Sequence, residues 1–163
     1  MHDAADAMPA AGQADGHTSR PIKLGALEDF IGFKLRLAQD TSFAVFSRQV
    51  GSHRVRPGNF ASLAVIGENP GLTQAALGQA IARDKSSVTP LVKGLEQDGL
   101  IERRPSATDR RSVTLWLTED GARALISLKR HAEEHERKLD RIIGSKNKPE
   151  MLRLLQKIIT ELN

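Results

Sequence analysis

Residues 72–121 read LTQAALGQAIARDKSSVTPLVKGLEQDGLIERRPSATDRRSVTLWLTEDG, and the order of elements in this stretch decides the fold. Thr73 has the side chain of a helix N-cap, which predicts a short helix after it. A second helix should follow Asp84 and end at Gly99, since glycine favours the left-handed conformation that terminates helices. One apolar stripe at helical spacing runs along this second helix, formed by Val88, Leu91, Val92 and Leu95.

After Gly99 the pattern changes from helical to alternating. Residues 101–104 and 113–117 predict two short strands, with Val113, Leu115 and Leu117 on one face of the second. The intervening residues from Pro105 onward can only be a turn or an exposed loop. A short helix, a well-patterned helix and a two-stranded hairpin with a basic tip are the layout of a winged helix-turn-helix.

Burial of the apolar stripe forces the opposite side of the second helix outward. That side is predicted to contact DNA through Ser86, Ser87, Thr89, Pro90 and Lys93. Short hydroxyl side chains and a lysine near a helix N-terminus suit close approach to phosphates and base edges. Pro90 removes a backbone donor about one turn into the helix. Either it shapes the outward surface, or the helix begins later than Asp84 suggests.

The hairpin tip carries Asp109, Arg110 and Arg111, which complete the predicted DNA-binding set. An arginine on a narrow protruding hairpin can enter a minor groove, where negative potential is concentrated. The neighbouring aspartate can fix its orientation. Taken alone this tripeptide would be a solvated loop, but its place in the layout favours DNA contact.

The stretch resembles the MarR family of transcriptional regulators. The similar elements are L-T-Q-x-x-L at 72–77, D-K-S-S-V-T at 84–89, L-x-x-x-G-L-I-x-R at 95–103, D-x-R at 109–111 and L-T-E-x-G at 117–121. The resemblance implies that the first and last helices pair two subunits. It also implies release of DNA when an aromatic acid or related small molecule binds between the dimerisation region and the DNA-binding lobe.

The flanking segments fit that plan. Apolar residues predict one long helix from Leu24 to about Val50, and Pro57 should begin another. Thr118 should cap a helix that runs to about Ile143, followed by a break at Gly144. Asn147 and Glu150 form a capping-box-like start to a last helix. That last helix carries a stripe of Met151, Leu152, Leu155, Ile158, Ile159 and Leu162.

These patterns predict a mainly α fold with a small β-wing. Residues 1–22 read as a disordered tail, residues 57–118 as the winged helix-turn-helix lobe, and residues 23–56 with 119–163 as a helical dimerisation region. A chain of 163 residues can bury a core of this size.

Composition excludes several classes of protein. There is no cysteine, which rules out disulfides and thiolate chemistry. The sequence shows no signal peptide and no apolar run long enough for a membrane span, so a cytoplasmic protein without membrane contact is expected. The formal net charge of +4 does not by itself identify a nucleic-acid binder. No nucleophile–base set or phosphate-binding loop is present, so neither an enzyme nor a cofactor is predicted.

His131 and His135 match the H-x-x-E-H pattern of inverted zinc peptidases. Too little chain remains after them to supply the rest of such an enzyme. We therefore expect a solvated helix face here and no metal site.

In the resembled family, the segment that runs from the dimerisation helix into the next helix borders the ligand cleft, so the resemblance implies a small-molecule site near residues 36–59. Its candidate residues combine aromatic walls with cationic and polar groups: Arg36, Phe43, Phe46, His53, Arg54 and Asn59. Such a set suits a planar anion, an aromatic carboxylate or its coenzyme A thioester. Two alternatives stay open: the arginines contact operator phosphates or merely solvate the surface, and the phenylalanines belong to the core or a dimer interface.

The sequence patterns predict a DNA-binding regulator, expected to be a repressor, that binds a pseudo-palindromic double-stranded DNA operator as a homodimer. The resemblance implies that this regulator responds to a ligand. The alternative is a winged-helix module that binds protein instead of DNA. A wing without arginine and an acidic helix between Asp84 and Gly99 would have favoured that alternative, and neither is seen.

Overall fold

The computed structural model describes residues 22–50, 56–106 and 112–162. These residues belong to two compact units, one ending at Leu37 and the other covering Ala38–Asn163. In chain order the elements are a 3-10 helix Gly25–Asp29, α1 Ile31–Val50, a 3-10 helix Pro57–Asn59, α2 Phe60–Glu68, β1 Leu72–Thr73, α3 Gln74–Ala80, α4 Lys85–Gln97, β2 Ile101–Pro105, β3 Val113–Leu117, α5 Glu119–Ile143 and α6 Lys148–Glu161. The predicted tail of residues 1–22 lies outside the described residues except for Ile22.

The predicted single helix from Leu24 is wrong at its start. Phe30 has extended backbone angles, φ −81° and ψ 119°, and separates the 3-10 helix from α1. Apolar residues recur at helical spacing in the sequence on both sides of Phe30. Their spacing therefore could not reveal that the backbone is extended at this residue. The unit that ends at Leu37 contains this break and the first residues of α1.

The other unit holds an antiparallel sheet with strand order β1-β3-β2. β2 and β3 form the predicted hairpin, with Ile101 opposite Leu117 and Arg103 opposite Leu115. β1 was not predicted, since two residues are too short to show a period of two. It adds Leu72 opposite Leu115, so Leu115 lies in the middle of the sheet and is 1% exposed.

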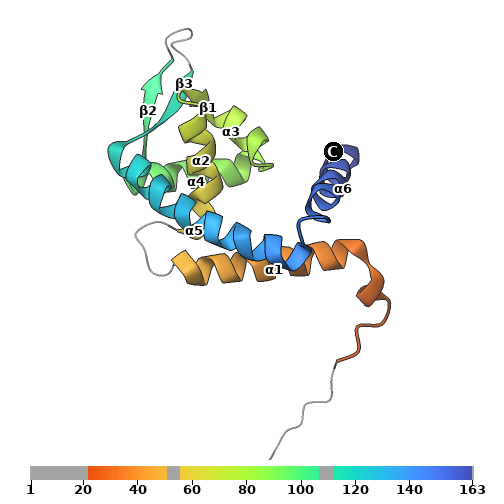
Figure 1. Ribbon diagram of the computed structural model, residues 1–163. Helices are drawn as coiled ribbons and strands as arrows, with labels where there is room; N and C mark the ends of the chain where they lie inside the picture. The colour runs from red at the N-terminus through yellow and green to blue at the C-terminus, as the bar shows by residue number, and fades with distance from the viewer. Residues whose placement is uncertain (1–21, 51–55, 107–111, 163) are drawn as a thin grey trace, which may run out of the picture. The chain divides into compact units, whose positions relative to one another are not determined.

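Helices α2, α3 and α4 gather beside this sheet, and α5 runs from the end of β3 past α2 (Figure 1). Their buried side chains form one core, made of Phe46, Val50, Leu63, Ile66, Leu77, Val88, Val92, Leu95, Leu100, Ile101, Leu115 and Leu128. The predicted stripe of α4 supplies this core, with Leu91 only partly buried. Val113 shares a face with Leu115 and Leu117 but is 45% exposed, because it lies toward the hairpin tip opposite Pro105.

Side-chain caps begin three of the helices. The Thr73 hydroxyl accepts a hydrogen bond from the Ala76 N–H at 3.2 Å, and the Thr118 hydroxyl accepts one from Gly121 at 3.0 Å. Both caps were predicted. Asp84 caps α4 in the same way. Gly99 has φ +69°, as expected of the residue that ends α4.

The predicted capping box of α6 is wrong. The Asn147 amide donates back to the Ile143 carbonyl at 2.9 Å, and no side chain caps the helix. Glu150 is held by Arg153 at 2.7 and 2.8 Å. The sequence pattern fitted, but Asn147 has helical backbone angles, which point its side chain toward the preceding turn. Along the described ranges of the chain, no helix is both long and apolar enough to cross a membrane.

Candidate nucleic-acid interface

The outward face of α4 is built by burial of its opposite face. Val88, Val92 and Leu95 are at most 2% exposed. The predicted DNA-contact residues of this helix lie on the other side. Ser86, Thr89, Pro90 and Lys93 are exposed, and Ser87 is half-buried.

Asp84 organises the first turn of α4. Its Oδ1 accepts the Ser86 hydroxyl at 2.6 Å and the Ser87 backbone N–H at 2.8 Å. The Ser86 hydroxyl, followed by the Ser87 N–H, holds the pKa of the Asp84 carboxyl below its ordinary value of 3.8. Asp84 is therefore an anion at neutral pH, and it holds Ser86 in one orientation.

A second hydrogen-bonded group joins α4 to α3. The Thr89 hydroxyl donates to the Lys85 carbonyl at 2.8 Å, and the Gln74 side-chain amide donates to the Thr89 hydroxyl at 2.9 Å. Gln74 belongs to the L-T-Q-x-x-L motif, but the sequence pattern assigns it no role. Nothing in the spacing of two residues on different helices could have paired them.

Pro90 lies inside α4, which begins at Lys85. The alternative that the helix begins later is therefore wrong. A proline at this position cannot donate to the Ser86 carbonyl, four residues before it. Pro90 thus leaves an acceptor on the exposed side of the first turn.

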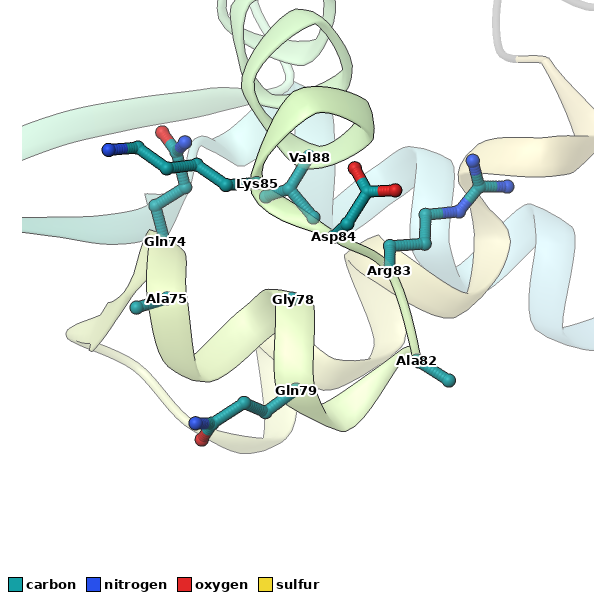
Figure 2. Close-up of a pocket in the computed structure, with 9 residues that line it drawn as sticks. All are labelled: Gln74, Ala75, Gly78, Gln79, Ala82, Arg83, Asp84, Lys85 and Val88. Atoms are coloured by element: carbon teal, nitrogen blue, oxygen red, sulfur yellow. The ribbon is translucent and has the colours of Figure 1, made fainter. Parts of the chain in front are cut away.

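The link between α3 and α4 is tight. A Cβ on Gly78 would stand 3.0 Å from the Arg83 carbonyl oxygen and 3.1 Å from Val88 Cγ2, so glycine allows the two helices to approach. Ala82 in the link has φ +50°. A surface hollow of about 620 Å³ lies between the helices. Figure 2 shows Gln74 and Lys85 on one side of it and Arg83 on the other.

The β2–β3 hairpin forms the wing. Its predicted contact residues, Asp109, Arg110 and Arg111, lie outside the described residues. Two further arginines on β2 have protein partners: Arg103 is 2.9 Å from Glu96, and Arg104 pairs with Glu102. The Arg104 guanidinium also lies 4.7 Å from the centre of the Trp116 ring. Arg103 therefore joins β2 to α4, Arg104 lies over the Trp116 ring of β3, and the tip stays the predicted DNA contact.

A cavity of about 310 Å³ lies between the second half of α1, α2 and α5. It is lined by Gln39, Ser42, Phe43, Phe46, Phe60, Ala132, His135 and Glu136. The sequence predicted Phe43 and Phe46 for a ligand site, and the structure brings them together here. The Phe46 ring centre is 6.0 Å from that of Phe60 and 5.9 Å from that of His135.

The histidines of α5 do not form a solvated face, so that prediction is wrong. Both His131 and His135 are half-buried, and His135 Nε2 is 2.8 Å from the Ser42 hydroxyl of α1. The sequence could not show that α1 covers this side of the long helix. In the portion of the chain that the structure describes, no group of three or more acidic or histidine side chains is placed to hold a metal ion.

Two further predicted ligand residues that the structure describes, Asn59 and Arg36, are not among the side chains that line this cavity. Asn59 is 8% exposed but does not line the cavity. Arg36 belongs to the unit that ends at Leu37, where its guanidinium is 5.4 Å from the Phe33 ring centre. His53 and Arg54 lie outside the described residues. Among the cavity-lining side chains of the described residues there is no arginine, and the one charged group is Glu136.

Comparisons with known proteins agree on one family. The model of the MarR family matches residues 56–113. A putative transcriptional regulatory protein for the hcr operon of Thauera aromatica is 33% identical over 135 residues, 82% of this chain and 81% of that protein. The transcriptional repressor CouR bound to a 23-mer DNA duplex is 30% identical, with a TM-score of 0.77, and the match covers 86% of this chain and 99% of CouR. CouR bound to p-coumaroyl-CoA is 27% identical, with a TM-score of 0.76, over 85% of this chain and 98% of that one.

Proposed function

Because this chain belongs to the MarR family of transcriptional regulators, we propose that it binds a pseudo-palindromic DNA operator as a homodimer, represses the adjacent genes, and leaves the operator when a small aromatic effector binds. We place this activity in the cytoplasm. The residues proposed to contact DNA are those of α4 and of the wing tip predicted from the sequence.

The observation that carries the proposal is the outward face of α4. It offers hydroxyl groups, a lysine and no large apolar side chain, on a helix held rigidly by a buried opposite face. A recognition helix in a major groove needs this combination. The CouR structure with a DNA duplex supports DNA as the ligand of this face.

The dimer is supported by apolar surface on α6. None of the side chains of α6 is buried, and large apolar groups remain exposed on it: Met151 40%, Leu152 55%, Leu154 45%, Ile159 55% and Leu162 83%. A second copy of the chain would cover this surface in a symmetric interface. We therefore assign residues 23–56 and 119–163 to dimerisation and residues 57–118 to DNA binding.

The effector is proposed to enter the aromatic cavity between α1, α2 and α5. Its volume of about 310 Å³ is at the small end of ligand sites and suits one aromatic ring. The CouR structure with p-coumaroyl-CoA supports an aromatic acyl group as the chemical class. An aromatic carboxylate and its coenzyme A thioester share that ring, and the coenzyme A part of the thioester would lie outside a cavity of this volume.

Selection from a random duplex library tests the DNA-binding part of the proposal. The full chain should enrich one inverted repeat, whose half-sites are separated by about one helical turn, ~34–36 Å. Enrichment of no common sequence would contradict it and would favour a protein-interaction module.

A further inference from the structure

Two hydroxyl groups on the outward face of α4 already donate their protons to acceptors of the protein itself. A serine or threonine hydroxyl has one proton to donate and two lone pairs that accept. Which of these remain available decides what the hydroxyl can recognise in DNA. Two hydroxyls of this face, Ser86 and Thr89, have hydrogen bonds that answer the question.

Thr89 donates its proton to the Lys85 carbonyl at 2.8 Å. A backbone carbonyl only accepts, so the direction of this bond is certain. The Gln74 amide contacts the same hydroxyl at 2.9 Å, and because the hydroxyl proton is already used, Gln74 must donate. One lone pair of Thr89 is left for an external donor.

Ser86 donates its proton to Asp84 Oδ1 at 2.6 Å. An ionised carboxylate only accepts, and bonds to it are among the stronger hydrogen bonds in proteins. For Ser86 to donate to a phosphate instead, it would have to give up this bond and bring the phosphate beside the Asp84 anion. Ser86 therefore also presents only lone pairs.

The exposed groups of DNA differ in what they offer such a hydroxyl. Phosphate oxygens, guanine O6 and N7, adenine N7 and thymine O4 all accept. In the major groove, the donors are the amino groups of adenine and cytosine. A hydroxyl that can only accept can form a hydrogen bond with these amino groups but not with the phosphate oxygens or the base acceptors.

We propose that Ser86 and Thr89 accept hydrogen bonds from amino groups of adenine or cytosine in the major groove. Asp84 and the Lys85 carbonyl take the two hydroxyl protons and so impose this direction, and Gln74 occupies one lone pair of Thr89 and positions the other. The inference rests on the proposed function, since it needs α4 to lie in a major groove. It adds a base-reading rule for the operator and gives Gln74, on a different helix, a part in specificity.

Operators with single amino groups removed test this rule. In the selected inverted repeat, each adenine is replaced in turn by purine and each cytosine by 2-pyrimidinone, and Kd is measured for the full chain. At one or more positions in each half-site the wild type should lose about five- to tenfold in affinity, the worth of one hydrogen bond. At those positions Ser86→Ala and Thr89→Val should show no further loss, whereas Thr89→Ser should behave as the wild type.

The positioning residues are tested by base preference and by the affinity lost on amino-group removal. Asp84→Ala frees the Ser86 proton and should reduce the preference for adenine or cytosine over guanine or thymine at the position read by Ser86. Gln74→Leu leaves the Thr89 proton on the Lys85 carbonyl, so the preference at the position read by Thr89 should persist. The affinity lost on removal of the amino group there should shrink, because the remaining lone pair is no longer held toward one base. Gln79→Leu, an exposed amide on the same helix α3, is the matched control and should leave both the preference and this loss unchanged. Circular dichroism confirms that each variant keeps its helices.

The outcomes separate this inference from the proposed function. The base-reading rule is overturned if the wild type binds its operator equally well without any of the amino groups. It is also overturned if Thr89→Val and Ser86→Ala depend on the amino groups as the wild type does. Either result leaves the proposed repressor function standing. Unchanged base preference in Asp84→Ala overturns the positioning role of Asp84, and an unchanged loss of affinity on amino-group removal in Gln74→Leu overturns that of Gln74. Failure to bind any inverted repeat overturns both proposals.

Discussion

Gly121 of α5 lies directly against the backbone of Leu100, where a Cβ atom would stand 1.9 Å from the Leu100 carbonyl oxygen. That carbonyl accepts the Thr118 N–H at 3.1 Å, and the Thr118 hydroxyl donates to the neighbouring Gly99 carbonyl at 2.6 Å. The end of α4 and the start of α5 are thereby joined at one point, which connects the DNA-binding lobe to the long helix.

Gly121→Ala should therefore be strongly destabilising. The added methyl group cannot be accommodated without moving backbone, so we expect the free energy of unfolding to fall by more than about 3 kcal/mol. Urea denaturation followed by circular dichroism measures it. Gly94→Ala is the matched control, because a Cβ there has nothing within 4 Å and alanine stabilises a helix interior by about 1 kcal/mol. Equal stability of the two variants would contradict the packing described here.

The Asp84 cap predicts a change in stability at acid pH. Because the folded state lowers the pKa of Asp84, its contribution is fully present above the ordinary value of 3.8 and is lost as the pH falls through the lower, folded value. Asp84→Asn keeps a capping side chain but cannot titrate. The stability difference between wild type and Asp84→Asn should thus shrink as the pH falls below 3.8. A difference that is constant with pH would show that the cap does not depend on the charge.

Deletion of residues 145–163 tests the proposed dimer. The deletion removes α6 and exposes the surface of α5 against which Met151, Leu152 and Leu155 line a cavity with Leu139 and Ile143. We expect aggregation, or monomers that no longer bind the inverted repeat, by light scattering and gel shift. A soluble truncated chain that binds the repeat with full affinity would refute the assignment.

The effector class is tested by releasing operator from the complex. A panel of aromatic carboxylates and their coenzyme A thioesters should contain a compound that releases DNA, and Phe43→Ala should weaken release because it removes one wall of the cavity. Substitutions of Arg36 and Arg54 distinguish a role of these arginines in effector binding from a role in contacting operator phosphates. If their substitution abolishes release while operator affinity stays normal, they belong to the effector site.

If the Arg36 and Arg54 variants instead lose operator affinity, and no member of the panel releases DNA, these arginines belong to the DNA interface. The proposed effector class would then be wrong. Glu136 lines the same cavity and pairs with Lys148 at 3.2 Å, so this lysine already offsets the carboxylate beside which an anionic effector would bind.

Local patterns predicted most of the lobe, and contacts between distant residues account for the rest. The stripe of α4, the caps at Thr73 and Thr118 and the limits of β3 follow from spacing and side-chain type within one element. The Gln74–Thr89 bond and the Ser42–His135 contact join different helices, so no spacing within one element reveals them. The break at Phe30 was missed because it interrupts the backbone without interrupting the apolar pattern.

The wing tip provides a prediction on residues that the sequence alone assigns. Arg111→Ala should weaken operator binding by more than about 1 kcal/mol, since an arginine placed in a minor groove loses both its charge and its hydrogen bonds. Gel shifts of this variant that match the wild type would contradict the assignment of the wing.

Sequence-specific DNA binding is the central claim, and one titration tests it most directly. The affinity of the full chain is measured for the selected inverted repeat and for a scrambled duplex of the same composition, over a series of salt concentrations. We predict at least about 10³-fold tighter binding to the repeat at physiological salt, and a steep fall in both affinities as salt rises. Equal affinity for the two duplexes, or no binding to either at low salt, would contradict the account.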